Sequence, residues 1–139
     1  MTRMRRACSW FLAAAVLAAL VGACGDDSDS DGTSDAKAVA QVMTALNVAS
    51  RAGDGERICG ELFTPKLAKS VSTSSSSGAC AVEVKAKLFS PEAKISVRNI
   101  DVPDEANASA TVKEANGNVS RIFLVKQSGQ WRIRGVAPA

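Results

Sequence analysis

The sequence predicts an α+β domain in which three to four helices precede a curved, four-stranded antiparallel meander. Up to about residue 89 the apolar residues recur at helical spacing, whereas beyond Pro91 they alternate with polar residues as in half-exposed strands. Two tight-turn signals, Asn116-Gly117 and Ser128-Gly129, divide the second part into hairpins. Helices followed by hairpin-connected strands favour two packed layers within one domain.

Caps and breakers divide the helical part. Ser34 or Asp35 caps the first predicted helix, and Gly53 ends it. Asp54 starts a second, short helix, and Thr64-Pro65 supplies the cap and the first position of a third. The first helix is predicted from an apolar stripe that consists of Val39, Val42, Met43 and Leu46.

Residues 79–89 fit two patterns. Cys80, Val84 and Leu88 keep helical spacing, whereas the even-numbered residues from Val82 to Leu88 alternate as in a strand. We predict a helix here, and the helices that carry Cys59 and Cys80 could then be joined side by side.

The first strand is predicted within residues 94–102. Its apolar residues change parity between Val97 and Ile100, so one residue near Arg98 or Asn99 is extra. An extra residue in an antiparallel strand produces a β-bulge and a bend. After a turn at Pro103-Asp104-Glu105, the next strand has an inner face of small residues, namely Ala106, Ala108, Ala110 and Val112.

The last two strands are predicted as a hairpin. Residues 119–127 are apolar on both faces, as in a central strand. In the final strand Trp131 and Ile133 are expected to face inward, whereas Arg132 and Arg134 face outward.

The N-terminus predicts export. Residues 1–23 contain three arginines, followed by an apolar stretch from Trp10 to Val21 that is shorter than the roughly 20 residues of a membrane-spanning helix. The sequence Val21-Gly22-Ala23-Cys24 resembles the lipobox of bacterial lipoproteins. This resemblance implies that Cys24 carries a diacylglycerol thioether and becomes the first residue of the mature chain. A secretory peptide cleaved after Ala23 and an uncleaved anchor are the alternatives.

Two segments are expected after the signal. Residues 24–35 comprise Cys24 and a flexible linker of Gly, Asp, Ser and Thr, a composition that buries no apolar surface. Residues 36–139 form one domain of a size that buries about two thirds of its unfolded surface. We therefore expect a protein that is lipid-anchored at the extracytoplasmic face of the cell membrane.

Charge argues against nucleic acid as a partner. The whole chain has 17 basic and 14 acidic residues, and the signal removes three arginines and no acid. The mature chain is therefore neutral, so the basic character of the precursor indicates no nucleic-acid binding. Five aspartates crowd the linker, which leaves an excess of five positive charges from Ala36 onward.

The cysteines are consistent with export. Cys8 leaves with the signal and Cys24 is assigned to lipid, so Cys59 and Cys80 remain as one pair. An oxidising compartment favours a disulfide between them. The alternatives are a metal site, for which two cysteines without histidine are too few ligands, and a redox pair, which usually has Cys-x-x-Cys spacing. No metal or cofactor is expected.

The order of these features resembles the nuclear-transport-factor-2-like superfamily, which has a cystatin-like cone. The resemblance rests on a leading amphipathic helix ending in Gly53-Asp54, on helices with paired cysteines, and on a bent meander closing in Gly129-Gln130-Trp131-Arg132-Ile133. It covers residues 35–137 and implies a curved sheet that wraps a long helix and leaves a pocket at its open end. Members include isomerase-like and cyclase-like enzymes, and exported domains without known chemistry.

Catalytic groups of those enzymes do not carry over. Isomerase-like members use an acid with a tyrosine, and others use a histidine-aspartate pair, but the chain contains no Tyr or His. The acids on strands are Asp101 and Glu114, both next to turns. Arg121 shares the parity of Phe123 and is interpreted either as an anion-binding group or as an arginine that extends to solvent. We assign no catalytic residue and name Arg121, Phe123 and Trp131 as pocket candidates.

Three functions follow from these features. The first is a non-catalytic binding or interaction module of the envelope, with a small apolar or anionic ligand or a protein as partner. The second is an isomerase-like or cyclase-like enzyme with an atypical site on Asp101, Glu114 or Arg121. The third is a structural partner that forms a homodimer through its sheet face.

Overall fold

A computed structural model of the chain describes residues 30–88, 95–114 and 116–139. The described residues form an α+β fold with four helical segments followed by a four-stranded sheet. The strands are β1 (Ser96–Asp101), β2 (Asn107–Lys113), β3 (Val119–Gln127) and β4 (Gln130–Pro138), antiparallel in the order β1-β2-β3-β4. The predicted meander is therefore confirmed. Within these ranges, no helix is long and apolar enough to cross a membrane.

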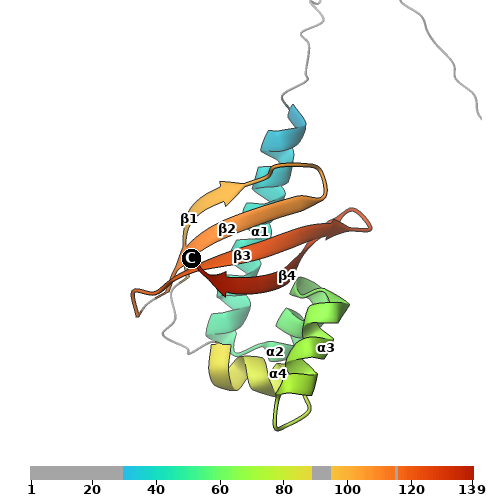
Figure 1. The fold of residues 1–139 in the computed structure, drawn as a ribbon, viewed down its shortest axis with the longest axis vertical. Coiled ribbons are helices and arrows are strands. Elements are labelled where there is room, and N and C mark those ends of the chain that lie inside the picture. Colours follow the sequence, from blue (N-terminus) through green and yellow to red (C-terminus); the bar gives the residue numbers. More distant parts are fainter. Residues whose placement is uncertain (1–29, 89–94, 115) are drawn as a thin grey trace, which may run out of the picture.

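The long helix α1 (Ser30–Ala52) lies behind the sheet, and the shorter helices gather near its C-terminal end (Figure 1). It begins five residues before Asp35, within the predicted linker. Ser34 and Asp35, the two predicted caps, therefore lie within the second turn, and neither of them caps the helix. Residues 25–29 of the linker, the signal and Cys24 lie outside the described residues.

The short helices begin at the predicted caps. Asp54 accepts a hydrogen bond from the Arg57 amide at 3.0 Å and starts α2 (Gly55–Arg57), which continues as the π-helix η1 (Ile58–Leu62). Thr64 accepts from the Leu67 amide at 3.2 Å and starts α3 (Pro65–Ser74). Side-chain acceptors at these positions satisfy amides that have no partner within the helix.

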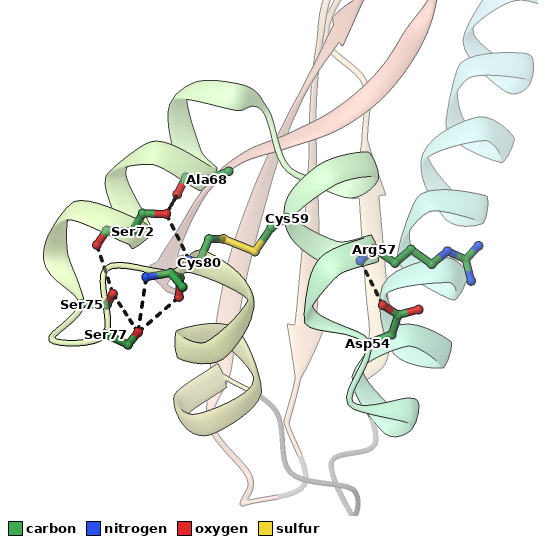
Figure 2. The surroundings of a disulfide bond; sticks show 9 residues. Asp54, Arg57, Cys59, Ala68, Ser72, Ser75, Ser77 and Cys80 are labelled. Atoms are coloured by element: carbon green, nitrogen blue, oxygen red, sulfur yellow. Dashed lines mark hydrogen bonds between the residues drawn. A yellow bond between two sulfur atoms is a disulfide. The ribbon is translucent and has the colours of Figure 1, made fainter.

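Residues 80–88 are helical, as predicted, in α4 (Cys80–Glu83) and the π-helix η2 (Val84–Leu88). Phe89 of the predicted helix lies outside the described residues. Cys59 and Cys80 form a disulfide with a Cα–Cα distance of 6.2 Å, so η1 and α4 are covalently joined (Figure 2). Ser72 supports this junction because its hydroxyl accepts from the Cys80 amide at 3.0 Å and donates to the Ala68 carbonyl.

Gly55 allows α2 to approach α4 closely. A Cβ at this position would overlap the backbone carbonyl of Ala81. Only glycine fits this contact, which lies four residues from Cys59 and one residue from Cys80. The disulfide therefore joins two helices that are already in backbone contact.

Two β-bulges bend the sheet. The predicted bulge in β1 is confirmed, because the register skips Arg98 between Val97 and Asn99. A second bulge in β4 was not predicted: Phe123 pairs with Gly135 and Leu124 with Ile133, so Arg134 is extra. The extra residue is an arginine in both strands.

The core lies between α1 and one face of the sheet, here called the inner face. Apolar side chains of α1 meet the small and branched residues of β2, β3 and β4, and the short helices close one end. Phe63 pairs with Ile133 at the edge of β4, where the Thr64 amide donates to the Ile133 carbonyl at 2.8 Å. The sheet edge is thus covered by the segment between η1 and α3.

Candidate functional site

The strand register assigns each side chain to one face of the sheet, because directly paired residues point to the same side. Ala110, Ile122 and their neighbours Ala108 and Leu124 lie on the inner face, and all four are buried. The opposite, outer face carries no helix among the described elements (Figure 1). The residues of β2 and β3 that belong to the outer face are all exposed or half-buried.

The three pocket candidates are divided between the two faces. Arg121 is exposed and Phe123 is half-buried, and both belong to the outer face. Trp131 pairs with Lys126 on the inner face, where it is 5% exposed. The structure therefore brings Arg121 and Phe123 together without Trp131.

Phe123 is covered by an arginine that the sequence did not indicate as a neighbour. The Arg134 guanidinium lies over the Phe123 ring, 5.9 Å from its centroid. This contact depends on the β4 bulge, since the extra residue puts Arg134 and Gly135 consecutively on the outer face. Cation–π attraction and the bulge together fix the position of this charge.

The outer face is strongly basic. Its one acidic side chain within the strands is Asp101, at the end of β1. None of its cations except Arg132 has a hydrogen-bonded partner, and none forms an ion pair, within the described residues. We call this surface the basic face; its cationic residues are Arg98, Lys113, Arg121, Arg132 and Arg134.

Arg132 has a structural role at the edge of the basic face. Its Nη1 donates to the carbonyls of Gly60 at 3.2 Å and Phe63 at 3.3 Å. These bonds attach β4 to the end of η1. The remaining cations of the basic face are exposed and free of such contacts.

The residues considered for an atypical enzyme do not converge. Asp101 and Arg121 are exposed, and no hydrogen bond or ion pair within the described residues links either to Glu114. Glu114 instead accepts from the Ser120 hydroxyl at 3.0 Å and from the Asn116 amide group at 3.2 Å. Its carboxylate thus holds the β2–β3 hairpin.

A polar contact at the opposite end of the sheet connects α1 to β3 and β4. Asp35 accepts from the Lys126 ammonium at 2.8 Å and from the Trp131 indole at 3.1 Å. The hydrogen bond from Lys126, followed by that from Trp131, lowers the pKa of Asp35 below its usual range. Sequence analysis placed Asp35 in the linker, and no local pattern reveals a partner 91 residues away.

Two other surfaces are open. A shallow depression of about 380 Å³ on α1 is lined by Asn47, Val48, Arg51 and Ala52. Within the described ranges the inner face is also uncovered at one end, where Val97 is 41% and Val136 is 56% exposed. Neither the depression on α1 nor the open end of the inner face has as many charged side chains as the basic face.

The described residues contain no group of three or more Cys, Asp or Glu side chains that could hold a metal ion. Comparison with known proteins gives no further assignment, because no family model, curated protein or solved structure matches the chain.

Proposed function

We propose that this chain is a lipid-anchored, extracytoplasmic module of the bacterial cell envelope with a nuclear-transport-factor-2-like cone, and that it binds a partner without catalysing a reaction. The basic face carries the proposal: four strands present cations without ion-pair partners around a half-buried phenylalanine, and no helix in the described part of the chain covers them. Arginine and aromatic side chains are enriched in protein interfaces relative to the rest of the surface.

The anchor is proposed from the N-terminal sequence. A lipidated Cys24 at the start of the mature chain supplies the hydrophobic attachment, since two acyl chains bind a bilayer stably where one does not. Because α1 begins at Ser30, at most six residue steps separate Cys24 from the domain. That segment spans at most roughly 21 Å when fully extended. The domain is thus held close to the headgroups.

The absence of a catalytic role is proposed from the arrangement of the acids. General acid–base catalysis needs groups that share one substrate position. Asp101 is solvated on the outer face, whereas Glu114 is engaged by Ser120 and Asn116. An atypical isomerase-like or cyclase-like site on these residues is therefore the weaker alternative.

One observation supports a second binding surface. The exposed valines Val97 and Val136 extend the inner face beyond its helical cover. In a cone-shaped fold this end is the mouth, and its apolar lining suits a small apolar ligand. Native mass spectrometry of detergent-extracted protein tests this candidate, since repeated absence of any retained molecule argues against it.

Site-specific photo-cross-linking tests the basic face directly. A photoreactive residue replaces Val119, which is 41% exposed beside Arg121 on the outer face, and the full chain is irradiated in intact cells. The matched control replaces Val82 of α4, which is 54% exposed. Adducts from position 119 alone are expected. Equal yields at both positions, or none at 119, contradict the proposal.

The anchor has its own test. Mass spectrometry of the mature chain is expected to find a diacylglycerol-modified Cys24 at its N-terminus, and Cys24→Ser is expected to release the protein from membranes. An unmodified N-terminus at Cys24, or recovery of the chain from the cytosol with residues 1–23 attached, rules the anchor out.

A further inference from the structure

We infer that the basic face binds a linear polyanion of the cell envelope, a polymer that carries phosphate or carboxylate groups at repeated intervals. This inference rests on the proposed function and names the chemical class of its partner.

The distribution of the cations favours a long ligand over a single small anion. Each strand contributes at least one exposed cation to the basic face: Arg98 from β1, Lys113 from β2, Arg121 from β3 and Arg134 from β4. Neighbouring strands lie about 4.8 Å apart, so these charges are spread over the width of the sheet. A ligand with repeated charges contacts several of them at once, whereas a single anion does not.

The centre of the basic face offers neutral hydrogen-bonding groups as well. Arg121 pairs across the ladder with Thr111, which in turn pairs with Asn99, so a guanidinium, a hydroxyl and an amide form one row. Guanidinium groups bind phosphate and carboxylate through paired hydrogen bonds. The row therefore suits an oxyanion at the middle of a bound polymer.

Phe123 helps to position one cation of the basic face. The Arg134 guanidinium lies over its ring, 5.9 Å from the centroid, and its charge also acts on the nearby Asp104, whose pKa is lowered chiefly by the hydrogen bond from the Ala106 amide. Within the described residues Arg134 forms no ion pair, so its guanidinium stays available to a partner while its position is already restricted, which lowers the entropy lost on binding.

A second copy of the chain is opposed by charge. In a face-to-face dimer, the cations of one basic face would meet those of the other, with Asp101 the one acid in the strands of each. Like charges placed opposite one another across an interface disfavour association.

An anionic bilayer is opposed by the acids near the anchor. Asp26, Asp27 and Asp29 lie between Cys24 and α1 in the sequence. The acidic turn that contains Asp104 lies at the same end of the domain, because Ala106 accepts from the amide of Lys126, the residue that binds Asp35. Anionic headgroups would repel this end, so we assign a polymer and not the membrane.

Binding of the purified full-length lipoprotein to linear polyphosphate tests the inference. Affinity is measured in neutral detergent at about 0.15 M salt and again at lower and higher salt. The double variant Arg121→Gln/Arg134→Gln is expected to bind roughly tenfold more weakly, and its affinity should depend less steeply on salt because fewer counterions are released.

The matched control removes the same charge from a helix. Lys66→Gln/Lys69→Gln takes two exposed cations from α3 and is expected to change affinity less than about twofold. Arg121→Lys/Arg134→Lys keeps the charge but not the paired guanidinium hydrogen bonds, so it is expected to bind more tightly than Arg121→Gln/Arg134→Gln and more weakly than the unmodified chain. Equal loss in the two glutamine variants, or a loss in the lysine variant as large as in Arg121→Gln/Arg134→Gln, overturns the inference, as does absence of polyphosphate binding by the unmodified chain.

Two competing occupants have distinct outcomes. If phosphatidylglycerol vesicles displace polyphosphate at equal phosphate concentration while phosphatidylcholine vesicles do not, the face binds membrane and the inference fails. If the chain sediments as a dimer that Arg121→Gln/Arg134→Gln alters, the face binds a second copy. Failure of polyphosphate binding with adducts at position 119 leaves the proposed function standing and removes this partner class alone.

Discussion

Leu124 and Phe123 are adjacent on β3, yet their side chains meet opposite environments. Leu124 is completely buried between the sheet and the helices, whereas Phe123 lies on the outer face beneath the Arg134 guanidinium. The inner face is made of small and branched apolar residues, and the outer face carries the basic residues. The inner face of the sheet thus stabilises the fold, whereas the outer face is the one proposed to bind a partner. Because side chains alternate along a strand, a residue's position in that alternation decides to which face it belongs.

The largest difference between the two faces is expected when Leu124 and Phe123 are each replaced by alanine. Leu124→Ala should lower the free energy of unfolding by about 3 kcal/mol, because it leaves a cavity in a filled core. Phe123→Ala should cost less than about 1.5 kcal/mol, since its ring is half-buried and loses mainly one cation–π contact. Urea unfolding of both variants checks this, and equal losses would contradict the separation of the faces.

The disulfide is expected to contribute to the stability of the fold and not to binding at the basic face. Replacing both cysteines, Cys59→Ala/Cys80→Ala, should lower the free energy of unfolding by about 3 kcal/mol, because a loop of 21 residues is no longer closed in the unfolded chain. Denaturant unfolding measures this loss. Polyphosphate affinity of the folded variant should stay unchanged, and a parallel loss of affinity would show that the helices shape the basic face.

Gly55 tests how tightly the helices beneath the sheet are packed. Gly55→Ala should destabilise the fold by about 2 kcal/mol, because the added methyl group overlaps the Ala81 carbonyl and α2 must move away from α4. Gly60→Ala is the matched control, as no heavy atom lies within 4 Å of its added Cβ. Thermal unfolding should separate the two variants; similar midpoints would rule out the close contact.

The smallest effect is expected at Asp35, where α1 is tied to the sheet. Its lowered pKa means that the ionised form is favoured by folding, so its contribution is complete above the usual carboxyl range near pH 4 and is lost as the pH falls through the lowered value. Asp35→Asn should therefore flatten the fall in stability as the pH drops below the usual carboxyl range. Chemical unfolding at several pH values measures this, and an unchanged pH profile would contradict the contact with Lys126 and Trp131.

Local signals predicted most of the fold. The caps at Asp54 and Thr64, the bulge at Arg98 and the order of the strands follow from spacing and turn chemistry, and the structure has them all. The Cys59–Cys80 disulfide is present as well. Each of these features depends on residues close in sequence or on a pair with no competitor.

The candidate site was harder to predict because both faces of β3 are apolar. Parity alone grouped Arg121 with Phe123, but it did not indicate which face α1 covers. The β4 bulge then shifts the alternation of faces between Ile133 and Val136 and brings Arg134 over Phe123. Only one extra residue marks this bulge in the sequence. Contacts such as Asp35 with Lys126 join residues far apart in the chain, and no local pattern encodes them.

A crossed comparison of Ile122→Ala and Arg121→Gln tests the separation of the two faces most directly. For each variant, the unfolding free energy is measured together with the yield of envelope cross-links from position 119. Ile122→Ala, on the buried inner face, should lose stability and keep its cross-links, whereas Arg121→Gln should keep its stability and lose them. If both properties fall together in either variant, the two faces do not have separate roles.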